Sequence, residues 1–383
     1  MKLRQAQLPQ GWEIKKLGEI CEVIAGQSPE GKYYNDKGNG LPFYQGKKEF
    51  NEKYLGEPTT WTTKTTKVAI KDDVLMSVRA PVGPINFSTQ KICIGRGLAA
   101  IRARDQISKE FLFNFLLLHE TELVGNTGAV FNSINKTQIE NIEIPFIPLP
   151  EQRHIVSILD EAFAAIAKAK ANTERNLQNT KELFESYLQS VFANPDWERK
   201  TLNEIAENLD SKRVPITKNV RKAGEYPYYG ASGIVDYVAD YIFDGDFLLV
   251  SEDGANLLDR TYPIAFSSTG KTWVNNHAHV LRFNSLISQR FVEYYLNSIK
   301  LDDYVSGMAQ PKLNQKMLNT IPIPFPSNQE QESIVDKLGL LSTETKKLET
   351  IYQQKLNDLE ELKKSILLKA FRGELKTKQE VLA

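Results

Sequence analysis

The sequence predicts a mixed α/β (α+β) protein in which two globular domains are joined by two long helices. The main observation is an internal repeat. Apolar and small residues recur at alternating steps of four and three over residues 155–187, and again over residues 334–366, which lie 179 positions further on. A proline-containing stretch that ends in Glu-Gln precedes each run, at residues 144–152 and 323–331. Two copies that each end in a long helix suit a protein that performs one task at two places.

Composition sets limits on the class of protein. A chain of 383 residues suggests two or three domains, each able to bury a core. The 48 basic side chains balance 48 acidic ones, which argues against a stand-alone nucleic-acid binder and leaves room only for local basic patches. Two cysteines, Cys21 and Cys93, argue against a disulfide framework and fit a reducing cytoplasm, with both thiols buried as small apolar groups. No apolar run approaches the length that spans a membrane.

The first domain is predicted over residues 1–150. It should contain a helix at residues 108–122 with Ser108 as its cap. Its predicted strands lie in residues 68–70, 74–78 and 92–101.

Residues 151–195 are predicted to be a spacer helix. Pro150 stands at its entry, Glu151 suits the positive end of the helix dipole, and Asn194-Pro195 would stop it.

The second domain is predicted over residues 196–328, with strands in residues 247–251 and 279–283. Residues 329–383 should form the second spacer helix and a C-terminal tail. Ser327 and Glu330 match a capping box, and Gly373 suits the position after the last helical residue.

The two domains begin alike and differ inside. Trp12 opens the first and Trp197 opens the second in similar phrases, but the residues between these openings and the helices diverge. One scaffold with two specificities explains this pattern. The alternative is an old duplication whose interior drifted.

The two repeated runs predict a coiled coil. About 40 helical residues extend about 60 Å, and only residues 193–195 separate the first helix from the second domain. The second helix should therefore run back along the first as an antiparallel coiled coil with a pseudo-two-fold relation between the halves. Two independent hairpins or an intermolecular coil are the alternatives. The predicted seam comprises Ile155, Leu159, Ala162, Ile166, Ala169, Thr173, Asn176, Thr180, Leu183 and Tyr187 in the first helix, and Ile334, Leu338, Leu341, Thr345, Leu348, Tyr352, Lys355, Leu359, Leu362 and Ile366 in the second.

Apolar residues outside this seam are predicted to lie on the outer faces of the helices, where partner helices would cover them. They are Leu177, Phe184, Leu188, Ile351 and Leu356.

No catalytic motif is found. Gly270-Lys271-Thr272 resembles the end of a phosphate loop, but Ala265 stands where that motif requires glycine. His277 and His279 have no cysteine or carboxylate at zinc spacing, which favours structural or hydrogen-bonding roles for them. The sequence therefore predicts a non-catalytic chain without a metal site.

Candidate recognition residues in the first domain are cations and one aromatic side chain. Lys47, Lys48, Trp61 and Lys64 belong to a basic, hydroxyl-rich stretch suited to phosphate contacts, although an exposed strand pair would have the same composition. Arg79, and Arg96 between Gly95 and Gly97, are candidates for bidentate donation to guanine.

The second domain contains a basic run without acids, formed by Lys212, Arg213, Lys218 and Arg221. Such a run suits contact with a DNA backbone; the alternative is a loop that is merely solvated. Two stretches, interpreted as exposed turns, add polar groups. Tyr229 and Ser232 lie in one of these turns. Glu252 or Asp253, as a cytosine acceptor, and Asn256, as an adenine reader, lie in the other, and the segment 273–279 adds further polar groups, including His277.

Taken together, these features resemble the specificity subunit of type I restriction-modification systems. The resemblance covers nearly the whole chain. It is carried by the phrases around Trp12 and Trp197, by residues 77–83, 251–256 and 273–279, by the two Glu-Gln lead-ins, and by the helix ends around Phe192 and Phe371.

The resemblance implies two target recognition domains, each reading one part of a split double-stranded DNA site. It also implies helices that set the spacing and dock two methyltransferase subunits, which bind S-adenosylmethionine and methylate adenine. ATP-dependent translocase-nuclease subunits would join to form the restriction enzyme. This chain itself would bind no cofactor. The alternatives are a coiled-coil adaptor that binds proteins and an enzyme with an unrecognised active site.

Overall fold

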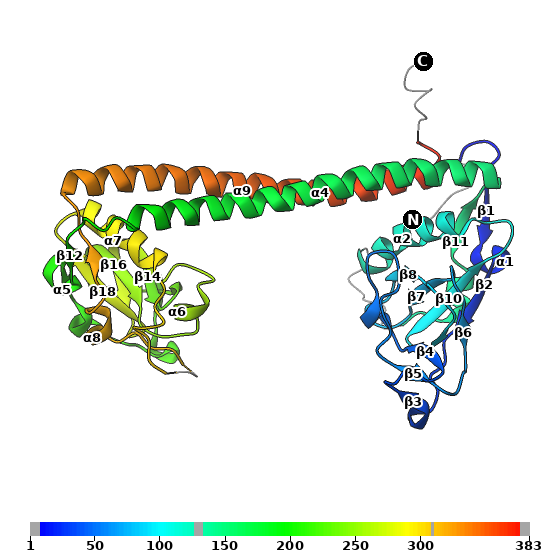
Figure 1. Ribbon diagram of the computed structural model, residues 1–383, viewed down its shortest axis with the longest axis horizontal. Helices are drawn as coiled ribbons and strands as arrows, with labels where there is room; N and C mark the ends of the chain where they lie inside the picture. Colours follow the sequence, from blue (N-terminus) through cyan, green and yellow to red (C-terminus); the bar gives the residue numbers. More distant parts are fainter. Residues whose placement is uncertain (1–7, 126–132, 308–309, 376–383) are drawn as a thin grey trace, which may run out of the picture. The chain divides into compact units, whose positions relative to one another are not determined.

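The computed structural model describes residues 8–125, 133–307 and 310–375. The chain divides into two compact units (Figure 1). Unit 1 contains residues 1–173 and 355–383, and unit 2 contains residues 174–354. Each unit therefore combines one globular domain with the adjoining parts of both long helices.

Unit 1 is built on an antiparallel four-stranded sheet and a smaller mixed sheet. The helix α2 (Lys109–Gly125) packs on the four-stranded sheet and contributes Phe111 and Leu112 to the core. The strands of the first sheet, in spatial order, are β2 (Cys21–Ala25), β10 (Leu98–Ala103), β7 (Val74–Ser77) and β8 (Ile85–Phe87). Those of the second are β3 (Tyr34–Asn35), β5 (Trp61–Thr62), β4 (Leu41–Tyr44), β9 (Ile92–Ile94) and β6 (Val68–Ala69).

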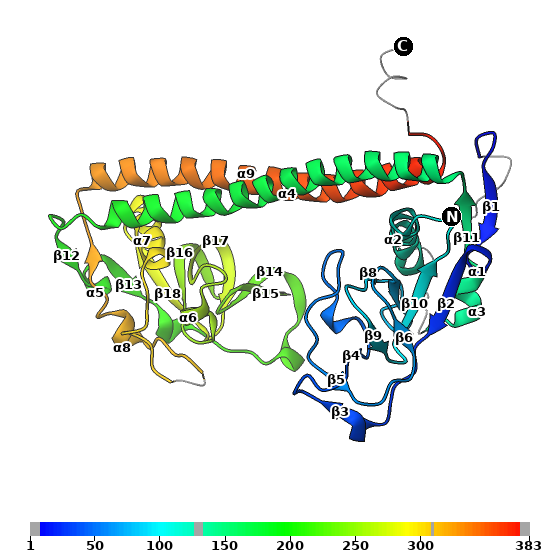
Figure 2. The same ribbon diagram turned by 45° about the vertical axis from the view of Figure 1, so that its right-hand side comes forward.

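Unit 2 has one six-stranded sheet, and α7 (Leu286–Ser298) covers its centre (Figure 2). Its strands, in spatial order, are β13 (Ala206–Asn208), β18 (Ala278–Phe283), β16 (Phe243–Ser251), β17 (Ala265–Val274), β14 (Ala223–Gly230) and β15 (Gly233–Val238). The order of the first four repeats β2-β10-β7-β8 of unit 1. The two units thus share a four-stranded frame and differ in what is attached to it.

The strands predicted in residues 68–70, 74–78, 247–251 and 279–283 are confirmed as β6, β7, β16 and β18. The single stretch predicted over residues 92–101 is wrong, because a turn divides it into β9 and β10. The predicted cap of α2 is confirmed, since Phe111 N donates to Ser108 Oγ over 3.2 Å.

A two-stranded ribbon leads into each long helix. In unit 1 the ribbon joins β1 (Glu13–Lys16) to β11 (Glu143–Phe146), and in unit 2 it joins β12 (Arg199–Lys200) to β19 (Ile323–Pro324). The short helices are α1 (Leu17–Ile20), α3 (Lys136–Glu140), α5 (Leu202–Ile205), α6 (Asn256–Asp259) and α8 (Gln315–Leu318).

The Glu-Gln lead-ins hold these ribbons to the helices. Gln152 is fully buried, and its Nε2 donates to Ile147 O over 2.7 Å, while Gln331 is equally buried and donates to Pro326 O over 2.8 Å. Glu151 accepts a 3.0 Å hydrogen bond from Trp12 Nε1. The repeated Trp and Glu-Gln phrases are therefore structural, because they lock the entry of the helix to the start of the domain.

The two predicted long helices are confirmed as α4 (Leu149–Phe192) and α9 (Asn328–Phe371). The capping box is present: Ser327 N donates to Glu330 Oε2 over 3.1 Å, and Glu330 N donates to Ser327 Oγ over 3.4 Å. Gly373 follows the helix with φ of 71°, a conformation that glycine adopts without steric cost. No helix in the described ranges is long and apolar enough to cross a membrane.

Within each unit the two helix segments pack side by side in opposite directions. In unit 1 Lys170 forms a 2.7 Å ion pair with Glu360, and Leu159 shares a core with Phe371. In unit 2 Leu188 shares a core with Leu338. The antiparallel pairing predicted from the sequence is therefore present in both units.

The predicted seam has the wrong phase in its later turns. Leu183 and Tyr187 were assigned to the seam, but their exposed fractions are 57% and 36%, while Leu188 is only 6% exposed and Phe184 packs against the core of unit 2. Leu177 is half-buried, whereas Asn176 is exposed.

Part of the predicted seam of α9 needs the same correction. Leu348 and Leu362 are exposed, whereas Leu356 is half-buried and Leu367 is 2% exposed. The seam residues Tyr352, Leu359 and Ile366 are half-buried, as predicted. Of the five residues predicted on the outer faces, Leu177, Phe184, Leu188 and Leu356 are therefore buried or half-buried instead. Ile351 is exposed as expected.

An eleven-residue period explains the shift in phase. Ile155, Ile166, Leu177 and Leu188 are eleven apart and all buried or half-buried, and so are their repeat equivalents Ile334, Thr345, Leu356 and Leu367. Eleven residues in three turns give about 3.7 residues per turn, closer to a straight α-helix than the heptad rhythm is. The buried hydroxyls in the seam are satisfied by their own helix: Thr173 donates to Ala169 O and Thr345 donates to Leu341 O.

Candidate nucleic-acid interface

In unit 1 three loops meet beyond the end of the central strand β7 and form a surface that we call apex 1. The loop after β7 joins the turn before β10 through Val78 N and Gly97 O, 2.9 Å apart. The same turn joins the end of β4, since Gly97 N donates to Gln45 O over 3.1 Å and Gly95 N donates to Tyr44 O over 2.8 Å. Strands β4 and β9 run parallel into this junction. Apex 1 consists of residues 45–48, 78–79 and 95–97.

Unit 2 has the same junction, apex 2, which consists of residues 230–232, 252–253 and 275–277. The loop after β16 joins the turn before β18 through Glu252 N and His277 O, 2.9 Å apart. Asn275 N donates to Tyr229 O over 3.0 Å, and β14 runs parallel to β17 as β4 does to β9.

A further bridge confirms that the two apexes correspond. Arg79 pairs with Ser133 in unit 1, and Asp253 pairs with Lys312 in unit 2. Ser133 and Lys312 are separated by the same 179 positions as the two helices. The backbone frame is therefore duplicated, while the side chains that it presents are different.

Apex 1 presents four cations. Lys47 and Lys48 follow β4, Arg79 follows β7, and Arg96 is at the tip of the turn before β10; all four side chains are exposed. The turn requires glycine on both sides of Arg96. A Cβ on Gly97 would lie 2.4 Å from Gln45 O, and one on Gly95 would lie 2.9 Å from Gln45 Cα. A tight turn that carries an exposed arginine can bring the guanidinium close to a polyanion or to the edge of a base.

Two other candidates of the first domain lie elsewhere. Trp61 belongs to β5, which pairs with the start of β4 rather than with its end. Lys64 is 3.8 Å from Glu30 and 5.0 Å from the centre of the Tyr33 ring. The basic stretch seen in the sequence is therefore divided, and only Lys47 and Lys48 reach apex 1.

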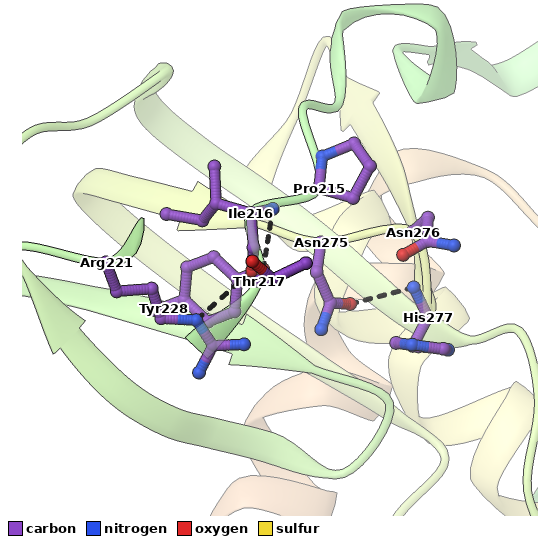
Figure 3. Close-up of a pocket in the computed structure, with 8 residues that line it drawn as sticks. All are labelled: Pro215, Ile216, Thr217, Arg221, Tyr228, Asn275, Asn276 and His277. Carbon is purple, nitrogen blue, oxygen red and sulfur yellow. Dashed lines mark hydrogen bonds between the residues drawn. The ribbon is translucent and has the colours of Figure 1, made fainter. Parts of the chain in front are cut away.

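A pocket of ≈ 370 Å³ adjoins apex 2 (Figure 3). Arg221 and Tyr228 form one side, where the guanidinium lies 4.2 Å from the centre of the ring and Arg221 Nη1 is 3.1 Å from Asp236 Oδ2. Asn276 and His277 form the other side. The remaining lining residues are Pro215, Ile216, Thr217 and Asn275.

The rim of this pocket is held rigidly. Tyr228 donates its hydroxyl to Ile216 O over 3.2 Å, and His277 N donates to Asn275 Oδ1 over 2.7 Å. Trp273 Nε1 donates to Val214 O over 2.7 Å, which ties the loop that contains Val214 and the lining residues 215–217 to β17.

A network of charged side chains packs beneath apex 2; it consists of Asp210, Arg213, Glu252, His279 and Lys312. His279 is 1% exposed, and its ring nitrogens face Asp210 Oδ2 at 2.6 Å and Leu313 O at 2.8 Å. Arg213 Nη1 lies 2.7 Å from Glu252 Oε2, and Lys312 Nζ lies 3.2 Å from Glu252 Oε1.

The network lowers the pKa of both carboxyl groups. Burial acts to raise the pKa of Asp210, but the hydrogen bond and charge of His279, with Val280 N and Arg213, outweigh burial and bring the pKa below its ordinary value. Burial also opposes ionisation of Glu252, and Arg213, His279 and Lys312 lower its pKa overall. Both groups are therefore held as carboxylates under the apex.

These contacts correct three predictions. Asn256 was expected in an exposed loop, but it is 8% exposed and bonds internally to Thr261 and Tyr262. Arg213 and Glu252 pair with each other inside the network rather than facing outward. The hydrogen-bonding groups of these three side chains are engaged in contacts within the fold, so they are not available to a ligand.

The remaining candidates of unit 2 vary in accessibility. Tyr229 is half-buried and stacks on Phe266, with ring centres 5.9 Å apart. Lys212, Lys218 and Ser232 are exposed. Arg221 and His277 line the pocket.

One apex residue, Asn276 as the equivalent of Arg96, was not selected from the sequence. The equivalent of Arg79 is Asp253, which the sequence offered as the alternative to Glu252. Asp253 lies 174 positions after Arg79 and Asn276 lies 180 positions after Arg96, so the 179-residue repeat of the sequence aligns neither pair.

The cysteines do not take part in either apex. Both are buried, as predicted, and burial raises the pKa of the Cys21 thiol to about 12. The described part of the chain contains no group of three or more His, Cys, Asp or Glu side chains placed to hold a metal ion.

The frame is thus duplicated and presents different polar side chains at equivalent places. A known family contains the same duplication. The family model for the type I restriction modification DNA specificity domain matches the chain twice, over residues 9–175 and 194–361. The chain therefore belongs to this family.

Individual relatives are similar over different lengths. A protein of Methanocaldococcus jannaschii, provisionally named as a type I restriction enzyme specificity subunit, is 39% identical over 181 residues, which cover 46% of this chain and 42% of the relative. A similarly named protein of Haemophilus influenzae is 35% identical over 42% of this chain and 41% of its own. These two alignments thus span less than half of the relatives' length. A type I specificity subunit of M. jannaschii is 22% identical over 97% of this chain and 94% of the relative.

Two solved structures share the fold. A chain from a type I restriction-modification system has a TM-score of 0.79 at 20% identity and covers 96% of this chain and 99% of its own. The HsdS subunit from Thermoanaerobacter tengcongensis has a TM-score of 0.60 at 20% identity and covers 96% and 98%.

Proposed function

We propose that this chain is the non-catalytic, sequence-reading subunit of a type I restriction-modification complex, in which unit 1 reads one half of a bipartite DNA target and unit 2 reads the other. The observation that supports this most directly is the duplicated apex. Two backbone hydrogen bonds, one β-bridge and one parallel strand pairing recur in both units, and the exposed side chains beside them differ. To read two different half-sites, one scaffold needs the same backbone frame in both units and different side chains at the two apexes.

Charge supports DNA as the ligand of apex 1. Lys47, Lys48, Arg79 and Arg96 are exposed on three loops that meet at apex 1, in a chain whose total charge is balanced. Cations placed in this way neutralise phosphates, and arginine can also donate two hydrogen bonds to guanine in the major groove.

Partners would supply the chemistry. In this proposal two methyltransferase subunits dock on the helices and bring S-adenosylmethionine, and ATP-dependent translocase-nuclease subunits complete a restriction enzyme. Exposed apolar side chains on the helices are suited to such docking, because water solvates them poorly. In unit 2 they are Leu183, Tyr187, Leu340, Leu348 and Ile351, and in unit 1 Leu362.

The experiment is methylome sequencing of cells that carry the chain with its methyltransferase partners. Arg96→Ala should relax or alter one base position in one half-site, because a bidentate arginine contributes roughly 1–3 kcal/mol of discrimination. Arg104→Ala is the matched control. Arg104 is an exposed arginine just beyond the other end of β10, where it donates to Glu19 O over 3.2 Å. An unchanged methylation pattern for Arg96→Ala, or an equal effect of both variants, would contradict the proposed role of apex 1.

The two other classes make different predictions. A protein-binding adaptor would show no DNA affinity that falls steeply with salt, whereas phosphate contacts release counterions and produce such a fall. An enzyme would transfer label from S-adenosylmethionine as a purified chain, without partners.

A further inference from the structure

The imidazole of His277 is oriented by a carboxylate at the tip of apex 2. Its Nδ1 lies 2.7 Å from Oδ2 and 3.0 Å from Oδ1 of Asp253. An ionised carboxylate only accepts hydrogen bonds, so Nδ1 must carry the hydrogen. In the neutral ring the other nitrogen, Nε2, then has a lone pair and acts as an acceptor.

Three contacts fix the backbone of the two residues in this pair. His277 N donates to Asn275 Oδ1 over 2.7 Å, and His277 O accepts from Glu252 N over 2.9 Å. Asp253 is held by its bridge to Lys312. The side chain of His277 is nevertheless 48% exposed, against 18% for Asp253. His277 thus lines the pocket (Figure 3) with a side chain that is nearly half exposed, while Asp253 engages its Nδ1.

We propose that His277 is a specificity-determining residue, whose Nε2 accepts a hydrogen bond from the exocyclic amino group of an adenine or a cytosine in the half-site read by unit 2. This inference rests on the proposed function. In the major groove the amino groups of adenine and cytosine are the donors, whereas guanine and thymine present oxygen acceptors. An acceptor facing an acceptor leaves both unpaired, which disfavours guanine and thymine at that position.

The two apexes would then read bases of opposite hydrogen-bonding character. Arg96 carries only donors and suits guanine, while His277 in the equivalent turn offers an acceptor and suits adenine or cytosine. Asp253 is a positioning residue in this scheme, because it acts on the base only through the tautomer of His277.

The test removes one amino group at a time from the DNA. The complex of the full chain with its methyltransferase subunits is bound to duplexes of the mapped target, in which each adenine is replaced in turn by purine and each cytosine by 2-pyrimidinone. We expect one replacement in one half-site to weaken binding by about tenfold, the effect of one hydrogen bond of ordinary strength. In the complex with His277→Ala, the same replacement should have no effect.

Asn284→Ala is the matched control, since Asn284 is exposed just beyond the other end of β18, outside apex 2. It should keep the sensitivity to the missing amino group. If no replacement weakens the wild-type complex, if His277→Ala keeps the sensitivity, or if Asn284→Ala removes it, the proposal is wrong. A wild-type complex that does not distinguish its target from a scrambled duplex would instead contradict the proposed function itself.

A second variant guards against misfolding of His277→Ala. In Asp253→Asn the side-chain amide can donate to Nδ1, which moves the ring hydrogen to Nε2 and turns the acceptor into a donor. The preference for an amino base should be lost at the same position. Nitrogen NMR shifts of His277 in the wild-type chain should show hydrogen on Nδ1, and hydrogen on Nε2 would overturn the inference.

Discussion

The phase of the helix seam leads to a sharp prediction on stability. Leu188 is 6% exposed and packs in the core of unit 2, whereas Leu183, five residues earlier on the same helix, is 57% exposed. The heptad rhythm of the sequence assigns them in the opposite way. Leu188→Ala and Leu183→Ala therefore distinguish the eleven-residue period from the heptad with one chemical change at two sites.

The expected difference is large. Truncating a buried leucine to alanine costs about 2–5 kcal/mol, through lost burial and the cavity left behind. Surface substitutions usually stay within about 0.5 kcal/mol. At roughly 2–4 °C per kcal/mol for a unit of this size, a 3 kcal/mol loss at Leu188 lowers the melting temperature of unit 2 by roughly 6–12 °C. Leu183→Ala should shift it by no more than about 2 °C.

Guanidinium and thermal unfolding of the full chain, followed by circular dichroism, measure both variants. Unit 1 provides an independent repeat of the experiment, since Leu367 is 2% exposed and Leu362 is 47% exposed. Equal losses within each pair, or a larger loss for Leu183→Ala and Leu362→Ala, would refute the eleven-residue seam.

Four further outcomes are expected. Gly97→Ala should destabilise unit 1 and abolish recognition by apex 1, because the new Cβ would lie 2.4 Å from Gln45 O, whereas Gly46→Ala meets nothing within 4 Å; equal melting temperatures and methylation patterns for the two variants would count against this reasoning. Asp210 and Glu252 have lowered pKa values in the fold, so their contribution to stability is present above their ordinary values of 3.8 and 4.5 and is lost as the pH falls through the lower folded values. Thermal unfolding between pH 7 and pH 3 should show this loss in the wild type and less of it in Glu252→Gln. Inserting eleven residues into each long helix keeps the seam in phase and adds about 16 Å of helix, so the unread gap in the target should change by about five base pairs while both half-site sequences persist in the methylome. The purified chain should show no methyltransferase, ATPase or nuclease turnover, and turnover that a point change in this chain removes would overturn its non-catalytic assignment.

Features that depend on neighbours in the sequence were predictable. The capping box at Ser327, the cap at Ser108 and the positive φ of Gly373 involve residues within four positions of one another. The long helices and their repeat were visible for the same reason, since helical periodicity is a local property. The exposed arginine between two glycines at Arg96 was also found, because the turn signal is local.

The details of the seam could not be resolved in this way. Steps of three and four fit both a heptad and an eleven-residue period over a few turns, and the two diverge only slowly along a helix. Which residues are buried is decided by packing against residues far away in the sequence, since Leu159 shares a core with Phe371 and Leu188 shares one with Leu338.

The sequence by itself determined the duplication, the two long helices and the polar residues available for recognition, because each of these follows from composition or from short-range spacing. Only the tertiary structure decided which polar residues remain available. Glu252 is taken up by Arg213, which is 39 positions away, and Asp253 orients His277, which is 24 positions away. The apexes themselves arise from strand register, which pairs Arg79 with Ser133 and Asp253 with Lys312. Register is set by long-range burial of the sheet faces, and no local pattern contains it.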